Sequence, residues 1–293
     1  MTASPKTVFI TGADGFVGSS LVRAFSEDGW CVIKGSRRPI EGADSVTRAY
    51  DLAWQALPPG LLDDVDAVVH AAMTRGAHDA EAIEANVEAA RLLKAAADAR
   101  GSHFIFVSSL AARDDAPSAY GKQKRRVELL LADSDAAIVR PGLVVGAGGL
   151  FLKMAAHLKR SPFVPIFNGG RQPLQTVHVD DVTRAIVRIA NARIAGTFVL
   201  AESPPVPYRT FLESLAQSLS RRAVLVPVPF GLFRSAAAVA ARIGVTLPAD
   251  ADSVLGLLAL RDTPPTADAR VVDRPLRSYR ESLASLAEQL TLD

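Results

Sequence analysis

Lys6-Thr7-Val8-Phe9-Ile10-Thr11-Gly12-Ala13-Asp14-Gly15-Phe16-Val17-Gly18 is the stretch of this chain that decides the fold. A short apolar run of β type ends at Thr11, three evenly spaced glycines follow, and apolar residues at helical spacing continue from about Val17 to Phe25. A strand, a glycine turn and a helix in this order place backbone N–H groups and a helix N-terminus against a pyrophosphate. The stretch therefore predicts a dinucleotide-binding site.

Each glycine of this turn has its own reason to lack a side chain. Gly12 permits the tight turn, Gly15 lets phosphates approach the backbone, and Gly18 lets the helix pack close to the strand. Three glycines alone are weak evidence, because a purely structural turn needs them too, so their place between a strand and a helix carries the prediction. Further candidates to contact the dinucleotide in this turn are Asp14, Phe16 and Val17.

The bulk composition is that of an ordinary soluble globular protein. Of 293 residues, 49% are hydrophobic and 22% are charged, enough for one large domain or two smaller ones. The formal net charge of +2 implies no polyanion, so we expect no nucleic-acid partner. The single cysteine, Cys31, excludes an intrachain disulfide, and the early first strand leaves no room for a signal peptide. Both observations lead us to expect a cytoplasmic protein.

Membrane and metal sites are not expected. The most apolar late stretch, Val224–Leu247, contains two prolines and two arginines. These residues argue for buried helix plus loop and against a membrane span, so we expect no membrane partner. Five histidines and one cysteine show no zinc-type spacing, so we expect no metal.

Strands and helices alternate through the first half of the chain. This alternation predicts parallel βαβ units in an α/β fold, a doubly wound parallel Rossmann sheet with functional loops at the carboxyl ends of its strands. The expected strands are Val8–Ile10, Cys31–Lys34, Ala67–His70, Phe104–Val107 and Ala137–Val139, with a short extra strand around Val46–Tyr50. The expected helices are Val17–Phe25, Ile83–Ala99 and Tyr120–Leu131.

The pattern changes after Pro141-Gly142. A glycine-rich loop, a helix over Phe151–Lys159 and a Pro/Gly-rich loop over Pro162–Gln175 come first, and a helix over Val182–Ala192 and a strand over Thr197–Leu200 follow. From Pro204 onward we expect loops and helices. We therefore predict two domains. Residues 1–145 with 176–200 form an NADP-binding Rossmann domain, and residues 146–175 with 201–293 form a smaller, mostly helical substrate-binding domain. The segments expected either to line the substrate pocket or to pack between the domains are Val145–Phe151, Phe163–Arg171 and Pro204–Tyr208.

The end of the second strand indicates which dinucleotide binds. In a dinucleotide fold an acid at this place holds the ribose 2′-hydroxyl of NAD, whereas an arginine suits the 2′-phosphate of NADP. This chain has Ser36-Arg37-Arg38 there, and guanidinium groups match phosphate geometry. The residues favour NADP, with NAD as the alternative, although two arginines in a solvated surface turn have the same appearance.

Two further strand ends are candidates for the cofactor. Asp51-Leu52 follows the extra strand, where the carboxylate is placed to accept a hydrogen bond from the adenine amino group. Alone, Asp51 is also an ordinary loop aspartate. His70-Ala71-Ala72 ends the third main strand with small residues, as a backbone close to a cofactor requires. A histidine in such a place is more often structural than catalytic.

The chemistry-bearing residues follow the next strand. Ser108-Ser109 ends it, and Tyr120 and Lys124, four residues apart, share one face of the helix that comes after. A free phenol has a pKa near 10, and a nearby ammonium lowers it. With a serine hydroxyl to hold the substrate oxygen, these groups form a proton relay for a carbonyl/alcohol pair beside a hydride donor. Tyr-x-x-x-Lys alone is a frequent accident on helices, so its place after the serines carries the prediction.

Taken together, these motifs resemble the extended branch of the short-chain dehydrogenase/reductase superfamily, the NAD(P)-dependent epimerases, dehydratases and reductases. The resemblance covers roughly the first two-thirds of the chain, in family order. The matching residues are Thr11-Gly12-x-x-Gly15-Phe16-x-Gly18, Asp51-Leu52, His70-Ala71-Ala72, Asn86, Ser108-Ser109, Tyr120-x-x-x-Lys124, Arg140-Pro141-Gly142 and His178-Val179-Asp180-Asp181.

The resemblance implies a role for each of these residues. Tyr120 is expected to be the catalytic acid/base, and Lys124 is expected to bind the nicotinamide ribose and lower the pKa of Tyr120. Ser109 is expected to orient the substrate oxygen, with Ser108 as its alternative. Residues expected to flank the nicotinamide are Pro141 and Gly142. Residues expected to be structural are Asn86, on the central helix, and His178 to Asp181, where the chain returns to the Rossmann sheet.

Three functions stay open at this point. An NADP-dependent oxidoreductase acting on a carbonyl or secondary alcohol is favoured by the complete Ser-Tyr-Lys set. A nucleotide-sugar epimerase or dehydratase is weakened because Leu174 replaces the expected arginine, with Arg171 nearby, and because Leu110 follows the serines where a dehydratase carries acids. A non-enzymatic NADP-binding regulator usually loses the tyrosine or the lysine. The helices Ile83–Ala99 and Tyr120–Leu131 either pair across a homodimer, as in many relatives, or pack inward.

Overall fold

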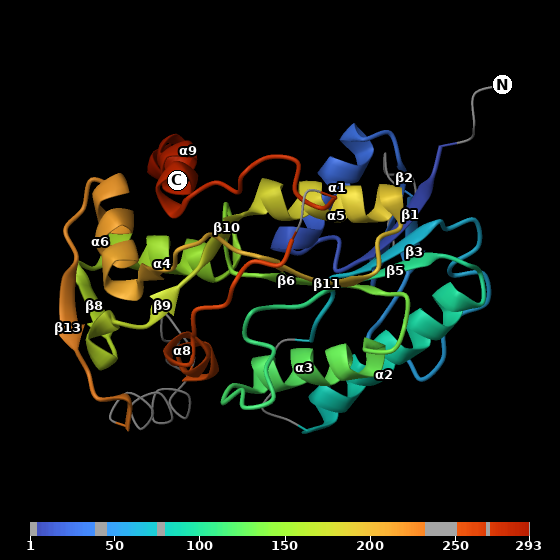
Figure 1. The fold of residues 1–293 in the computed structure, drawn as a ribbon, viewed down its shortest axis with the longest axis horizontal. Coiled ribbons are helices and arrows are strands. Elements are labelled where there is room, and N and C mark those ends of the chain that lie inside the picture. The colour runs from blue at the N-terminus through green and yellow to red at the C-terminus, as the bar shows by residue number, and fades with distance from the viewer. Residues whose placement is uncertain (1–4, 39–45, 75–79, 232–250, 268–269, 293) are drawn as a thin grey trace.

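A computed structural model of the chain describes residues 5–38, 46–74, 80–231, 251–267 and 270–292 (Figure 1). Much of the apolar stretch Val224–Leu247, over residues 232–247, lies outside the described residues. Within the described parts, no helix is both long enough and apolar enough to cross a membrane.

A parallel sheet of seven strands forms the centre of the larger part, in the order β11-β6-β5-β4-β1-β2-β3. Its strands are β1 (Thr7–Thr11), β2 (Cys31–Ser36), β3 (Val46–Ala49), β4 (Ala67–His70), β5 (His103–Val107), β6 (Ala137–Pro141) and β11 (Gly196–Leu200). Every residue of β4 and β5 is buried, because helices cover both faces of the sheet. The strand order reverses between β1 and β4, the place where doubly wound sheets bind dinucleotides. The predicted fold class is thereby confirmed.

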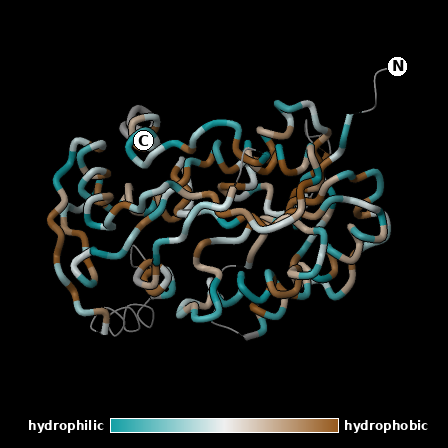
Figure 2. The backbone as a smooth tube through the Cα atoms, in the orientation of Figure 1, coloured by the Kyte–Doolittle hydropathy of each residue, from teal (hydrophilic) through white to brown (hydrophobic). Residues whose placement is uncertain are grey.

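Two helical layers cover this sheet (Figure 1). Helices α1 (Phe16–Glu27) and α5 (Val179–Ala192) pack on one face, over a core that includes Phe25 and Ile186. Helices α2 (Ala80–Asp98) and α3 (Ala119–Leu131) pack on the other, over Leu93 and Phe104. Figure 2 shows hydrophobic residues concentrated along the central strands. The helices sit within a few residues of the predicted ranges.

A smaller unit, at the left of Figure 1, has an apolar core of its own that includes Phe151, Phe211 and Leu283. Its elements are α4 (Gly149–Arg160), β8 (Phe163–Ile166), a 3₁₀ turn (Asn168–Gly170), β9 (Pro173–Leu174), β12 (Val206–Pro207), α6 (Tyr208–Ser218), β13 (Val224–Pro227), α8 (Ala251–Leu258) and α9 (Tyr279–Leu292). A separate parallel pair, β7 (Leu143–Val145) with β10 (Thr176–His178), leads into α5. The exact domain division stays a prediction.

Short strand pairs correct part of the sequence prediction for this unit. The stretch Pro162–Gln175, expected as a loop, contains β8 and β9, and β12 and β13 lie in the region expected to hold only loops and helices. β13 pairs with β8 in parallel, and β12 pairs with β9 antiparallel. Strands of two to four residues whose partners lie far along the chain leave no periodic signal in the local sequence.

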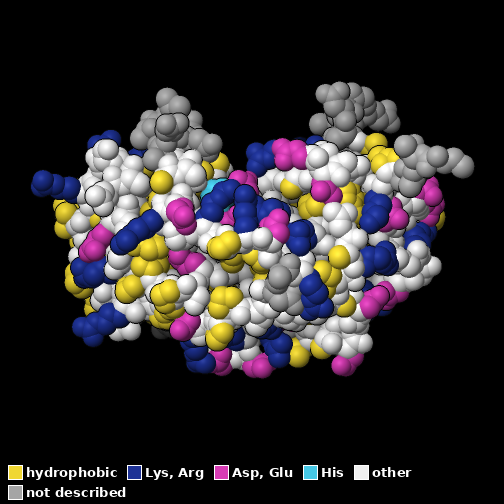
Figure 3. Space-filling view, turned by 45° about the horizontal axis from the view of Figure 1, so that its top comes forward, with side chains coloured by type: hydrophobic (Ala, Val, Ile, Leu, Met, Phe, Trp, Pro, Cys, Tyr) yellow, Lys and Arg dark blue, Asp and Glu magenta, His cyan; other side chains and the backbone are white. Residues whose placement is uncertain are grey.

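The surface carries charges of both signs. On the face shown in Figure 3, Lys and Arg side chains are interspersed with Asp and Glu side chains. Over the described ranges, no group of three or more His, Cys, Asp or Glu side chains is placed to hold a metal ion. The thiol of Cys31 is free and exposed.

Candidate active site

The glycine turn is as tightly packed as its sequence predicts. Gly12 has a φ of +70°, and a Cβ there would lie 2.8 Å from the Cα of Ala72. A Cβ on Gly18 would lie 1.9 Å from the Gly12 carbonyl oxygen, so α1 comes too close to β1 for any side chain. The Gly15 N–H donates to the same carbonyl at 2.9 Å. These contacts bring the end of β4 and the start of α1 together at one edge of the sheet.

Phe16 connects this turn to the glycine-rich loop before α4. A Cβ on Gly146 would lie 2.7 Å from the Phe16 ring, and one on Gly148 would lie 2.5 Å from it. The ring therefore fills space that only glycines leave open. The sequence showed both glycine clusters, but nothing in it indicated that they pack through one aromatic side chain.

The end of β2 meets the glycine turn. The Ser36 hydroxyl donates to Asp14 Oδ2 at 3.4 Å, and the Arg38 N–H donates to Ser36 Oγ at 3.3 Å. Arg37 and Arg38 are both exposed. The structure thus brings together the residues predicted to select the dinucleotide, and it adds the carboxylate of Asp14 to that place.

Asp51 and Leu52 have local partners. Asp51 Oδ1 accepts a hydrogen bond from the Ala53 N–H at 2.9 Å, an ordinary loop contact that leaves its second oxygen available. Leu52 packs against the core under α2 and α3.

His70 and Asn86 hold the backbone beside the glycine turn. His70 Nδ1 lies 2.8 Å from Thr11 Oγ1, which also accepts from the Ala72 N–H at 3.2 Å. Burial, together with the nearby Lys124, lowers the pKa of His70 to about 3, so its imidazole is neutral at ordinary pH. Asn86 Oδ1 accepts from the Thr74 N–H at 2.9 Å. Both side chains fix the chain that follows β4.

Tyr120 stands in the first turn of α3, and Ser109 follows the carboxyl end of β5. Burial raises the pKa of Tyr120, and hydrogen bonding with the Ser109 side chain opposes that effect. The net shift is upward because desolvation of the phenol outweighs that hydrogen bond, and the lowering expected from Lys124 stays a prediction. At neutral pH Tyr120 is protonated.

Lys124 lies on the same face of α3, as its spacing predicts. Its Nζ donates to the Val107 carbonyl at 2.6 Å, lies 4.6 Å from the centre of the Phe106 ring and 6.0 Å from that of Tyr120. Burial lowers its pKa to about 8, and the charge of Glu128 acts the other way. Lys124 is thus an ammonium ion that loses its proton readily.

Ser108 is occupied by a buried ion pair that the sequence did not reveal. Its hydroxyl donates to Glu128 Oε1 at 2.6 Å, and Glu128 accepts from Arg140 Nε at 2.7 Å and Nη2 at 2.5 Å. The Glu128 side chain is 1% exposed. Ser109, whose Oγ accepts from the Ala111 N–H at 3.1 Å, remains the serine nearer to Tyr120.

Pro141 and Gly142 lie where β6 ends. The Gly142 N–H donates to the Leu200 carbonyl at 3.0 Å, and a Cβ there would lie 2.4 Å from the Gln175 carbonyl oxygen. Only glycine fits at position 142, because the backbone at Gln175 passes too close to leave room for a side chain. At the nearby return to the sheet, His178 caps α5 through the Asp180 N–H at 3.2 Å, in the structural place expected for it.

Asp252 is a site neighbour that sequence reasoning missed. From α8 it accepts hydrogen bonds from the Ala119 N–H at 2.6 Å and the Tyr120 N–H at 3.1 Å. Ser118 caps the same turn by accepting from the Gly121 N–H at 3.1 Å. No local pattern relates residues more than 130 positions apart, whereas Ser118 is a recognisable N-cap.

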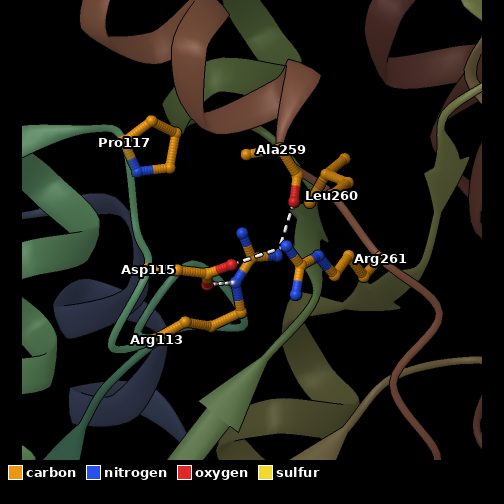
Figure 4. A pocket seen from close by; sticks show the side chains of 6 residues that line it. All are labelled: Arg113, Asp115, Pro117, Ala259, Leu260 and Arg261. Carbon is orange, nitrogen blue, oxygen red and sulfur yellow. Dashed lines mark hydrogen bonds and ion pairs between the residues drawn. The ribbon is translucent and has the colours of Figure 1, made fainter.

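A pocket of about 330 Å³ opens beside the loop that follows Ser109 (Figure 4). Arg113 and Arg261 both contact Asp115 there, and Arg113 also donates to the Ala259 carbonyl at 2.5 Å. Of the segments expected to line a substrate pocket, Pro204–Pro207 border a separate pocket of about 730 Å³ beyond β11.

The sequence pattern of the NAD dependent epimerase/dehydratase family matches residues 8–201, a stretch that contains the glycine turn, Ser109, Tyr120 and Lys124. The chain belongs to this family. This assignment confirms the resemblance to the extended short-chain dehydrogenases/reductases, and it makes the chain an NAD(P)-dependent oxidoreductase or epimerase.

Relatives of this epimerase/dehydratase family member include reductases. A ceramide reductase of Caulobacter vibrioides is 33% identical over 216 residues, which cover 69% of this chain and 66%, just under two thirds, of that protein. A 4-hydroxy-2-methyl-3-oxo-4-farnesyl-3,4-dihydroquinoline-1-oxide ketoreductase of Stigmatella aurantiaca is 26% identical over 78% of each chain. UDP-glucose 4-epimerase of Thermotoga maritima, in a structure with UDP-glucose, is 18% identical with a TM-score of 0.72, covering 98% of this chain and 100% of its own. That likeness confirms the fold.

Proposed function

We propose that this family member is an NADP-dependent reductase that interconverts a carbonyl compound and its secondary alcohol. The observation that most supports this proposal is a protonated Tyr120 that hydrogen-bonds with the Ser109 side chain and shares its helix face with Lys124. Ser109 follows the carboxyl end of β5, and Lys124 on α3 donates to the Val107 carbonyl at that end, on the same edge of the sheet as the glycine turn.

The three side chains have separate tasks. Ser109 donates a hydrogen bond to the substrate carbonyl oxygen and holds it near the phenol. Tyr120 delivers its proton to that oxygen as negative charge develops on it. Lys124, as an ammonium ion, stabilises the phenolate left behind, which then takes a proton from solvent. A bound nicotinamide dinucleotide in its reduced form supplies the hydride.

The dinucleotide fits the residues of this edge. The pyrophosphate would lie on the start of α1, whose N-cap residue Gly15 has no side-chain capping bond and leaves the first N–H groups free of such a partner. Pro141 and Gly142 would flank the nicotinamide, and Lys124 would hold its ribose. Asp51, through its second carboxylate oxygen, would accept from the adenine amino group.

NADP is favoured over NAD by the two exposed guanidinium groups of Arg37 and Arg38 beside Ser36. Asp14 opposes this preference, because a carboxylate near Ser36 also suits the 2′-hydroxyl of NAD. The Arg37→Ala, Arg38→Ala double variant is expected to lose NADPH affinity while NADH affinity changes little. An unchanged ratio of the two affinities would show that the arginines do not read the 2′-phosphate.

Reduction is favoured over epimerisation by two observations. Leu174, at the place of the diphosphate-binding arginine of sugar-nucleotide enzymes, is 1% exposed in the small-unit core, whereas Arg171 is exposed. Two of the relatives, acting on a ceramide and on a quinoline ketone by their names, are reductases. We therefore assign net reduction of a ketone, with nucleotide-sugar epimerisation as the second candidate.

The decisive experiment follows NADPH oxidation at 340 nm with a panel of ketones, including ceramide-like and quinoline ketones, and tests UDP-sugars for isomerisation in parallel. We expect stoichiometric NADPH consumption with a ketone, lost in Tyr120→Phe, whereas Tyr279→Phe retains it. Tyr279 is a buried tyrosine in the small-unit core and serves as the matched control. Sugar isomerisation without net NADPH consumption would establish the epimerase instead, and full activity of Tyr120→Phe would exclude the relay.

A further inference from the structure

Helix α8 lies between the small-unit core and the helix that carries Tyr120. Leu257 and Leu260, at and just after its end, pack against the small-unit core. A Cβ on Gly256 would stand 3.7 Å from Ser118 Oγ, so the helix also passes directly over the start of α3. Figure 1 shows α8 beside that end of α3. One short helix therefore contacts both parts of the molecule.

Asp252 makes the contact at the first turn of α3. The first N–H groups of a helix have no partner within the helix, and capping groups must satisfy them. The two carboxylate oxygens of Asp252 accept from the N–H groups of Ala119 and Tyr120, and Ser118 accepts from that of Gly121. A carboxylate at this position is further stabilised by the helix dipole. Its bonds are charge-assisted and stronger than those of the serine.

The segment after α8 is attached to the loop that follows Ser109. Arg113 donates to the Ala259 carbonyl, and Arg261 Nη2 lies 2.5 Å from Asp115 Oδ2 (Figure 4). Thr263 and Gln175 exchange two hydrogen bonds, of 2.8 and 2.9 Å. The chain from Asp252 to Thr263 therefore holds both the loop that begins at Ser109 and the turn that begins α3.

We propose that Asp252 is a positioning residue, which fixes the first turn of α3 and with it the place of Tyr120 relative to Ser109. The inference rests on the proposed function, in which Tyr120 delivers the proton. It assigns a task in catalysis to the C-terminal part of the chain, which lies beyond the stretch matched by the family. Because the Tyr120 backbone N–H is itself one of the two donors, a loss of the cap moves the tyrosine directly.

The test compares Asp252→Ala with Asp252→Asn, and with Asp262→Ala as a control at an exposed aspartate of the same segment. For Asp252→Ala we expect kcat for NADPH-dependent ketone reduction to fall by about tenfold, equivalent to roughly 1.4 kcal/mol of barrier. NADPH affinity should stay as in the wild type. Asp252→Asn keeps one acceptor oxygen and should recover most of kcat. Asp262→Ala should resemble the wild type.

Hydrogen exchange measured on the same proteins gives a readout that needs no substrate. Peptides spanning 117–124 should exchange about tenfold faster in Asp252→Ala than in Asp262→Ala, because the cap no longer protects two amides. A wild-type kcat in Asp252→Ala, or a change in KM alone, would overturn the positioning role. Helix α8 would then only pack over the start of α3. If the wild type reduces no ketone, the proposed function fails. The exchange rates then decide by themselves whether Asp252 holds the turn.

Discussion

Replacing Lys124 with methionine tests whether the ammonium ion is as strongly desolvated as the structure indicates. Burial lowers the Lys124 pKa from 10.5 to about 8. Below pH 8 both the folded and the unfolded chain carry the charged lysine, so the folded protein bears the full cost of burying it. Between pH 8 and 10.5 the unfolded chain binds more protons than the folded one, so wild-type stability rises with pH. A shift of this size corresponds to about 3 kcal/mol in all.

The assay is urea unfolding of the wild type and Lys124→Met between pH 7.5 and 9.5. We expect the free energy of unfolding of the wild type, relative to the variant, to increase by roughly 2 kcal/mol over this range. The bond from Lys124 to the Val107 carbonyl is lost in the variant at every pH, so it offsets the two curves without changing their slopes. The control is Lys122→Met, at an exposed lysine of the same helix. A difference between wild type and variant that does not change with pH would refute the reasoning.

Three further predictions concern packing, charge and assembly. Glu128→Gln should destabilise the fold by about 3–5 kcal/mol in urea unfolding, because the buried partner of Arg140 loses its charge. Glu84→Gln, in an exposed pair with Arg126, should destabilise the fold much less, and equal losses of unfolding free energy in the two variants would contradict this prediction. Gly18→Ala should abolish NADPH binding measured by fluorescence, because its Cβ would lie 1.9 Å from the Gly12 carbonyl oxygen. Gly256→Ala, whose Cβ would make only ordinary van der Waals contacts, should bind NADPH as the wild type does. Retained binding in Gly18→Ala would contradict the tight turn. Leu129 and Leu130 are 54% and 40% exposed on α3, so we propose that α2 and α3 pair across a homodimer. The double variant Leu129→Glu, Leu130→Glu should halve the mass measured by light scattering, whereas Leu152→Glu, at an exposed leucine of α4, should not. A monomeric wild type would refute the proposal.

The sequence predicted those parts of the molecule whose local structure depends on residues that are close together in the chain. The glycine turn, the strand ends at His70 and Ser109, and the face shared by Tyr120 and Lys124 all follow from local periodicity, because βαβ units place strand ends at one edge. The short strands β8, β9, β12 and β13 could not be predicted, since each depends on a partner far away in the chain. Glu128 and Asp252 were missed for the same reason. Their sequence context is that of ordinary helix residues, and only the fold gives them Arg140 and the first turn of α3 as partners.

The two perturbed groups on α3 together favour the direction of reduction. Burial raises the pKa of Tyr120 and lowers that of Lys124 to about 8, so each shift opposes ionisation of its own group. Because its raised pKa keeps Tyr120 as the phenol at neutral pH, little phenolate is present to take a proton from an alcohol, whereas the phenol holds the proton that a carbonyl oxygen requires. As pH rises, Lys124 therefore gives up its charge before Tyr120 does. The alkaline decline of ketone reduction should then begin near pH 8 and follow the lysine, and Lys124→Arg, which stays charged, should move that decline to higher pH. A decline that begins at the same pH in Lys124→Arg would assign the limiting proton to another group.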